Sequence, residues 1–344
     1  MLKEKRNLTL YKQDFEKFFR LLSETFTIFG PSKTDGGRSF TKIDASDKIA
    51  FDYKNTKMSL KEFFFPQTET LFFFDSEKNE VKQTDVETNK HNILFGVRPC
   101  DALSISFLDK VFNENNPPDL YYTRRRKSTR IVSFACTNPA STCFCTSVGC
   151  GPDSETGSDI IFFDLDGRYF IKTVTLEGEK IIKSVEKLLN PATKNDIEEK
   201  VHLMKTANSN LKKIFDSGNL QKKLDNFNAP YWEKLHRKCL GCGICTYFCP
   251  TCHCFDITDE VIKSNGRRIR TWDSCMFSLF TLHASGHNPR PSQKERMRQR
   301  IMHKFNYAPK YYGKTFCVGC GRCIINCPVN MDIRDVMKEI MEER

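Results

Sequence analysis

The sequence predicts an α+β protein with two domains, a mixed α/β domain over residues 1–228 and a mostly α-helical domain over residues 229–344. Three observations support this prediction. Short apolar runs typical of buried strands alternate with helical spacing in the first half. A helical, Lys/Asn-rich pattern from Ile181 to Leu224 then ends at Asn228-Ala229-Pro230, where proline is well placed for the first turn of a new helix. Beyond that point, cysteine motifs alternate with helical patterns.

Spacing of apolar residues predicts the elements of the first half. The segment from Leu10 to Phe29 is predicted to be an amphipathic helix. Its core-facing stripe comprises Phe15, Phe18, Phe19, Leu22 and Phe26. Strands are predicted at 70–74, 92–97 and 130–134, with a helix at 101–112 between two of them. The segment DIIFFDLDGRYFIKTV is predicted to form a hairpin that turns at Asp166-Gly167.

Length and composition limit the class of protein. A chain of 344 residues can bury a sizeable core, so its 16 cysteines are not needed as disulfide staples. The charged, polar start MLKEKRNLTLYKQ has no signal-peptide pattern, which predicts a cytoplasmic protein with reduced thiols. No apolar run approaches the roughly 20 residues that span a bilayer, so no membrane partner is expected. The formal charge of +11 is typical of proteins that bind acidic partners or nucleic acid.

Two copies of one cysteine motif, CLGCGICTYFCP and CVGCGRCIINCP, lie in the second half. Three cysteines at every third residue can surround three corners of a [4Fe-4S] cluster, and Gly241 and Gly243 give the backbone the freedom to wrap it. In bacterial two-cluster ferredoxins the fourth cysteine of each motif ligates the other cluster. We therefore predict a ferredoxin-like domain with two sets of ligands. The first set is Cys239, Cys242, Cys245 and Cys327, and the second set is Cys249, Cys317, Cys320 and Cys323.

Zinc is the alternative for these motifs, but zinc sites favour cysteine pairs with a longer gap and would leave several cysteines unexplained. Crossed ligation would also join the two ends of the intervening segment, residues 250–316. A bound cluster with four thiolates carries a charge of about −2, so part of the positive charge of the chain is expected to compensate buried clusters.

Further cysteines lie in the first half. We hypothesise a third set of [4Fe-4S] ligands, because two of its cysteines directly follow predicted strands, where loops often form sites. This third set is Cys100, Cys136, Cys143 and Cys145. The alternative is that they are buried free thiols. Cys150 is left without a role.

Three more thiols, Cys252, Cys254 and Cys275, lie between the paired motifs, together with His253. They could hold a further metal, but we expect them to line the neighbouring cluster or to contact a partner. His283 and His287 would share one face of a helix, and such a pair is more often structural than metal-binding.

Two segments are strongly basic, 124–127 and 290–304, and the second contains Lys294, Arg296, Arg298, Arg300 and Lys304. We expect both segments to form solvated faces. The functional alternatives are that they dock to an acidic partner or that they raise the reduction potential of nearby clusters. No nucleic-acid-binding motif surrounds them. The chain also lacks GxGxxG, P-loop and GxSxG motifs, so we predict no flavin, nicotinamide or ATP site and no catalytic residue.

Several segments together resemble one iron-sulfur family: FGVRPCDALS, ACTNPASTCFC, RTWDSCMFSLFTLHASGHN and the paired motifs with their trailing CPTCHC. They are similar to the iron-sulfur electron-transfer subunit of anaerobic sulfite reductase and equally to the β subunit of cytosolic sulfhydrogenases. The resemblance runs from PSKTDGGRSF to the last motif.

This resemblance implies a multisubunit complex in which the chain relays electrons from an FAD-containing, NAD(P)H-oxidising flavoprotein. The main prediction is the electron-transfer subunit of a sulfite reductase whose sirohaem subunit reduces sulfite to sulfide, because the chain ends soon after the last motif, at Glu343-Arg344. The first alternative is the β subunit of a [NiFe] sulfhydrogenase. A cluster-stabilised nucleic-acid-binding or scaffold protein, and a self-sufficient reductase with an incompletely ligated cluster, are the remaining alternatives.

Overall fold

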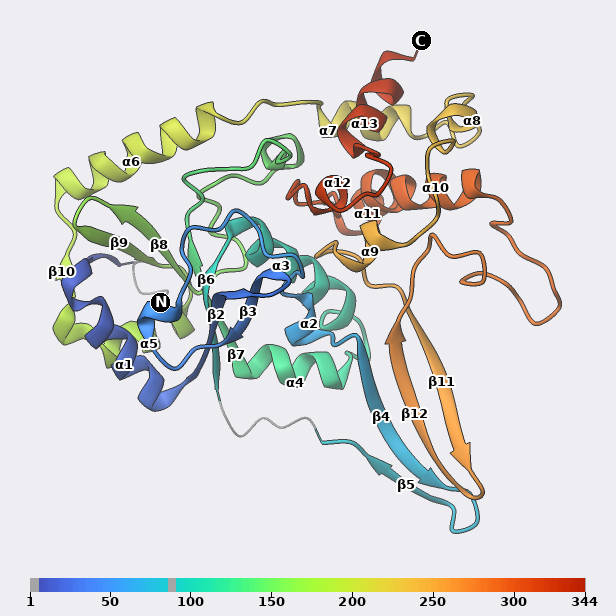
Figure 1. The fold of residues 1–344 in the computed structure, drawn as a ribbon, viewed down its shortest axis with the longest axis horizontal. Helices are drawn as coiled ribbons and strands as arrows, with labels where there is room; N and C mark the ends of the chain where they lie inside the picture. Colours follow the sequence, from blue (N-terminus) through green and yellow to red (C-terminus); the bar gives the residue numbers. More distant parts are fainter. Residues whose placement is uncertain (1–5, 86–90, 344) are drawn as a thin grey trace.

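The computed structural model describes residues 6–85 and 91–343 and shows a large β-sheet flanked by helices and a second, smaller β-sheet (Figure 1). Residues 1–5 of the polar N-terminal stretch and Arg344 lie outside the described residues. The strands are β1 Asn7–Tyr11, β2 Thr27–Thr34, β3 Gly37–Lys42, β4 Thr68–Asp75, β5 Glu80–Gln83, β6 Asn92–Val97, β7 Thr129–Phe134, β8 Ile160–Leu165, β9 Arg168–Thr173, β10 Asn190–Pro191, β11 Phe255–Ile262 and β12 Asn265–Trp272.

The helices alternate with strands in the first half, and short helices surround the hairpin of β11 and β12 in sequence in the second half. They are α1 Phe15–Thr25, α2 Lys61–Phe64, α3 Pro99–Phe112, α4 Leu120–Ser128, α5 Leu176–Ser184, α6 Lys194–Ser209, α7 Ser217–Lys223, α8 Trp232–Leu235, α9 Ile244–Tyr247, α10 Gln293–Met302, α11 Ala308–Tyr312, α12 Arg322–Ile325 and α13 Ile333–Glu342. A π-helical turn, His303–Tyr307, joins α10 to α11. Among the described residues, no helix is long and apolar enough to cross a membrane.

The large sheet has the strand order β10-β1-β9-β8-β7-β6-β2-β3. Its centre is parallel, since β6 pairs in parallel with both β2 and β7, and β7 pairs in parallel with β8. Alternate residues of β6 point to opposite faces, as expected for a strand. Ile93 and Phe95 pack with α1, whereas Leu94 belongs to the cluster that includes residues of α3. A register shift between Phe95 and Val97 places Val97 in the same cluster as Leu94. The sheet is therefore covered by helices on both faces.

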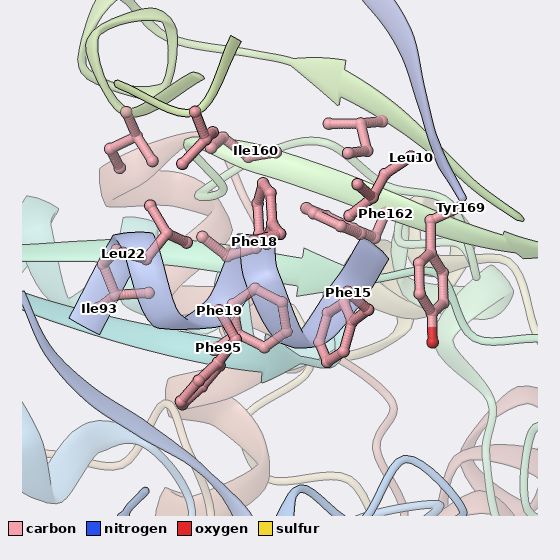
Figure 2. Packing of buried hydrophobic residues seen from close by; sticks show 14 of the residues in the cluster. Leu10, Phe15, Phe18, Phe19, Leu22, Ile93, Phe95, Ile160, Phe162 and Tyr169 are labelled. Atoms are coloured by element: carbon pink, nitrogen blue, oxygen red, sulfur yellow. The ribbon is translucent and has the colours of Figure 1, made fainter. Parts of the chain in front are cut away.

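Aromatic side chains from α1 form the centre of one of these faces (Figure 2). Phe15, Phe18 and Phe19 point from the helix towards the sheet, where Phe95 and Phe162 receive them. The ring centroids of Phe18 and Phe162 are 5.8 Å apart, with a steep interplanar angle of 66°. Such edge-to-face packing adds to the gain from apolar burial.

The second sheet forms an arm that extends away from the helices of the second half (Figure 1). Its order is β11-β12-β4-β5, so a hairpin of the second half pairs with strands of the first half. Arg270 on β12 anchors the pairing, because its buried guanidinium contacts Glu69 on β4 at 2.5 Å. The Trp272 indole donates to the carbonyl of Phe65 at 3.0 Å.

The structure confirms the mixed α/β content, including strand β6 at 92–97 and the hairpin of β8 and β9 that turns at Asp166-Gly167. It corrects the predicted helix from Leu10 to Phe29, because α1 covers only Phe15–Thr25 and strands β1 and β2 flank it. The second half is less helical than predicted, since β11 and β12 make a long hairpin. A boundary at 228 stays a prediction.

A buried ion pair joins the two halves beside the second cysteine motif. Arg322 of that motif donates to both carboxylate oxygens of Asp101 on α3, at 2.6 and 2.7 Å. Both side chains are almost fully buried, with 1% and 0% of their surface exposed. Arg322 also donates to the Thr56 carbonyl at 2.8 Å, so its donors are well used.

We predict that Asp101→Asn destabilises the protein by about 3–5 kcal/mol, because it leaves the Arg322 guanidinium buried without a counter-charge. The midpoint of anaerobic thermal unfolding should fall by several degrees. The control is Asp259→Asn, which breaks an exposed pair with Arg268 on the arm and should leave the midpoint unchanged. Equal midpoints for the two variants would contradict the prediction.

Candidate metal centres

The first set lies around one cavity. Cys239, Cys242, Cys245 and Cys327 all line one partly open pocket of about 440 Å³, adjoining solvent included, although Cys327 is far from the others in sequence. Neutral groups donate to two of its sulfurs. The Gln293 side-chain amide lies 3.1 Å from Cys239 Sγ, and the Met331 N–H lies 3.2 Å from Cys327 Sγ. Cys242 is exposed, so this set is close to solvent.

The second set comes together where the segment after Cys249 contacts the start of the second motif. The Thr251 hydroxyl donates to the carbonyl of Phe316, next to Cys317, at 2.7 Å. Burial raises the pKa of both Cys317 and Cys323, and Cys249 is close enough that its negative charge raises them further. Both motifs have the same local form, a glycine at positive φ followed by a single helical turn, α9 or α12.

The third set lines a second, partly open pocket of about 380 Å³, adjoining solvent included, so the structure brings together four cysteines that sequence spacing grouped only weakly. Cys100 lies in the first turn of α3, and Cys136 follows β7. Cys143 and Cys145 come from the loop between β7 and β8. Cys150 is buried next to Cys145, and its backbone N–H donates to the Cys145 carbonyl at 3.0 Å, but it is not among the residues that line the cavity.

The three sets lie in a row and share walls. Cys323 of the second set also lines the cavity of the first set. Cys320 of the second set lines the cavity of the third set, and its carbonyl lies 3.9 Å from Cys143 Sγ. The second set is therefore central, with the first and third sets on either side.

A glycine of the second motif allows the second and third sets to approach each other. Gly319 has φ +64°, and a Cβ placed on it would lie 2.5 Å from the backbone Cα and N of Cys145. Its carbonyl accepts from the N–H of Phe144 at 2.8 Å. Only a glycine permits both this left-handed conformation and this backbone approach.

Burial keeps many of these thiols protonated unless a metal displaces the proton. It raises the pKa of Cys143 to about 11 and that of Cys317 to about 12. Binding iron would thus release protons. Cys249 differs, because contact with the Cys252 thiol and the charge of Lys304 lower its pKa.

Buried cations show that this interior fits anionic clusters. Lys61, Arg300 and Lys304 are all buried, and no ion pair of the described residues involves them, whereas nearby Lys294 and Lys310 pair with Glu233 and Asp225. Burial lowers the pKa of Lys61 to about 8. Burial alone would also lower the pKa of Lys304, but neighbouring thiolates raise it well above its usual value. Thiolate-bound clusters would supply the missing negative charge.

The three further thiols and His253 lie near the sets already described. Cys252 contacts Cys249 of the second set, whereas Cys254 and Cys275 contact each other, and Cys275 is also near Cys245 of the first set. The Nδ1 atom of His253 lies 3.1 Å from the Thr251 carbonyl, and its ring packs on aromatic rings.

His283 and His287 do not share a helix face, because they lie in an exposed turn in which the His283 N–H donates to the His287 carbonyl at 2.9 Å. In the described part of the chain, no three His, Cys, Asp or Glu side chains converge closely enough to hold a single metal ion.

The basic segment 290–304 divides into two groups. Lys294, Arg296 and Arg298 are at least partly exposed, whereas Arg300 and Lys304 are buried. Sequence reasoning missed Lys61, whose Nζ donates to the carbonyls of Thr246 and Cys252 at 3.2 and 3.1 Å and lies over the Trp272 ring. No motif signals this residue, because its partners are distant in sequence.

Two comparisons with known proteins bear on these sites. The sequence model described as "4Fe-4S dicluster domain" matches residues 238–331, a range that contains every cysteine of the first and second sets. Sulfhydrogenase 2 subunit beta of Pyrococcus furiosus is 34% identical over 98% of this chain and 99% of its own length.

We predict that Cys327→Ala removes the cluster of the first set, despite the distance in sequence. Its EPR spectrum after reduction should match that of Cys242→Ala, and each variant should lose about four irons per chain. Cys320→Ala, in the second set, is the reference for the other outcome. A Cys327→Ala spectrum that matched Cys320→Ala would show that the crossed assignment is wrong.

We also predict that Gly319→Ala is far more damaging than Gly241→Ala, although both occupy the same place in their motifs. Each alanine would cost about 1–2 kcal/mol in a left-handed conformation. At Gly241 the new Cβ would meet the flexible end of Gln293 at 2.7 Å, but at Gly319 it would meet backbone. Iron content should fall in Gly319→Ala and stay near wild type in Gly241→Ala. Similar iron loss in both would contradict the role of backbone contact.

Proposed function

The chain belongs to the iron-sulfur family of the sulfhydrogenase β subunits, and on this premise we propose that it is the electron-transfer subunit of a sulfhydrogenase-type complex. It would receive electrons from a flavoprotein that oxidises NAD(P)H and pass them to a [NiFe] hydrogenase pair. This was the first alternative in the sequence-based prediction. The similarity to a sulfhydrogenase subunit over almost the whole chain favours it over the sulfite reductase.

The observation that carries this proposal is the row of three thiol sets. A bound [4Fe-4S] cluster accepts and releases one electron. Shared wall residues Cys323 and Cys320 connect the first set to the second and the second to the third. An electron could thus cross the protein from the exposed side at Cys242 to the far side of the third set without leaving the interior. Each set offers four thiols, so no incompletely ligated cluster is needed.

The alternatives find less support. A nucleic-acid-binding protein would need its basic residues at the surface, but Arg300 and Lys304 of the basic segment are buried. A sulfite reductase subunit remains the second candidate, because the family resemblance in RPCD, TCFCTS and WDSC includes the iron-sulfur subunit of anaerobic sulfite reductase. The metal content of the purified complex separates the two, since nickel indicates the hydrogenase and sirohaem absorbance indicates the sulfite reductase.

We predict that Cys136→Ala interrupts electron transfer by removing the third cluster. The wild-type chain should contain about twelve irons, and the variant about eight. In the intact complex, NAD(P)H-dependent reduction at the catalytic subunit should fall at least tenfold, while H₂-dependent viologen reduction by the hydrogenase pair should not change.

Cys150→Ala is the matched control, because Cys150 is buried beside the third set without lining its cavity, and it should keep both iron and rate. Eight irons in the wild type would remove the third cluster from the proposal. Clusters that fail to cycle reversibly in a redox titration would contradict the relay itself.

A further inference from the structure

The central set differs from its neighbours in the charge that surrounds its sulfurs. Lys304 is 4% exposed, and its Nζ lies 3.2 Å from Cys249 Sγ. The same Nζ donates to the Thr251 hydroxyl at 3.0 Å and the Phe316 carbonyl at 3.1 Å. These three contacts hold the ammonium group in one position against a ligand sulfur. In the described part of the chain, Lys304 is the one ionised side chain with a hydrogen bond to a sulfur of the three sets.

The π-helical turn His303–Tyr307 contributes to this placement. Lys304 follows α10, and the wider turn begins one residue before it. Such turns insert an extra residue into a helix and often occur at functional sites. The carbonyl of Lys304 also accepts from the Phe316 N–H at 3.0 Å, so the backbone and the side chain of this residue both contact the start of the second motif.

Arg300 is a second cation without a carboxylate. It lies one helical turn before Lys304 on α10, is 5% exposed, and its Nε has no hydrogen-bond partner among the described residues. It lines the cavity of the first set, where Cys323 of the second set also lies. Its guanidinium therefore lies on the border between the first and second sets, and it stays charged at any accessible pH.

The cations beside the neighbouring sets make no hydrogen bond to a sulfur in the described part of the chain, although Arg300 lines the cavity of the first set as well. Neutral donors, the Gln293 amide and the Met331 N–H, contact the first set. Near the third set, Arg322 is neutralised by Asp101. Arg98 and Lys54 both line the cavity of the third set. Arg98 is half-buried and donates to the carbonyls of Phe51 and Ala135 at 3.2 and 3.4 Å, and Lys54 is exposed, so solvent screens its charge.

We propose that Lys304, assisted by Arg300, is a positioning residue that raises the reduction potential of the central cluster, so that a transferred electron rests on the second set. This inference rests on the proposed relay function and adds an internal order of potentials to it. A fixed cation beside a cluster stabilises the added negative charge of the reduced form, and the effect is strong where water is excluded. The first and third sets would then exchange electrons with the partners, while the central set stores one.

The test is an EPR-monitored redox titration of the intact protein in four forms: wild type, Lys304→Gln, Lys304→Arg and Lys310→Gln. The signal of the central cluster is identified as the one missing in Cys320→Ala. Glutamine keeps a donor near Thr251 and Phe316 but removes the charge. Lys304→Gln should change the ratio of oxidised to reduced central cluster at least tenfold at fixed ambient potential, which equals a downward shift of about 59 mV for one electron.

The controls separate charge from shape. Lys304→Arg keeps the charge and should remain near the wild-type potential. Lys310→Gln removes an exposed charge on α11, paired with Asp225, and should not shift any cluster. An unchanged central potential in Lys304→Gln would overturn the inference while leaving the relay intact. Failure of the wild-type clusters to cycle would instead refute the relay.

If the Lys304→Gln protein loses the central cluster, its potential cannot be measured, and a second variant then tests the inference. Arg300→Gln should lower the potentials of both the central and the first-set clusters, because Arg300 lines their border, and leave the third unchanged. No shift in Arg300→Gln would then overturn the inference. Iron loss in Lys304→Arg as well as Lys304→Gln would also overturn it, because it would show that Lys304 acts through its shape.

Discussion

The structure depends on balancing positive charge in a place from which water is excluded. Lys61 enters the interior from the first half of the chain, Arg300 and Lys304 enter it from the basic segment 290–304, and no carboxylate of the described residues pairs with them. An isolated buried charge would cost many kcal/mol. The thiol sets supply the opposite charge, because thiolates that hold iron are negatively charged and lie beside these cations. Cluster assembly and folding of this region are therefore coupled, and the apo chain would have a strained interior.

The same requirement explains why the two halves cannot be separated cleanly. Lys61 comes from the first half and reaches the carbonyls of Thr246 and Cys252 in the second. Asp101 pairs with Arg322, and Gly319 allows the second motif to approach the backbone of Cys145. The arm adds a shared sheet in which β4 pairs with β12. The motifs are thus built into the preceding α/β domain, and this contact brings the third set next to the second.

Local patterns could be predicted from the sequence, and non-local partners could not. The cysteine spacing identified the paired motifs, and the apolar run of Asn92–Val97 identified β6, because each signal lies within one short segment. The hairpin of β11 and β12 was missed, since charged residues fill DITDEVI and NGRRIRT and its partner β4 lies about 190 positions earlier. The helix around Phe15 was predicted too long, because apolar residues continue into β1 and β2.

The basic segment 290–304 shows a limit of a different kind. Its charges are typical of a solvated helix, and for Lys294 and Arg298 that interpretation holds, but Arg300 and Lys304 follow at helical spacing and are buried. The sequence does not distinguish the exposed residues Lys294 and Arg298 from the buried residues Arg300 and Lys304. Arg300 and Lys304 can be buried because an anionic group that is not part of the polypeptide balances their charge. Part of the formal charge of +11 therefore compensates the negative charge of the bound clusters. In a cysteine-rich chain, an excess of Lys and Arg over Asp and Glu can reflect anionic clusters held in the interior. It therefore does not by itself indicate an acidic partner at the surface.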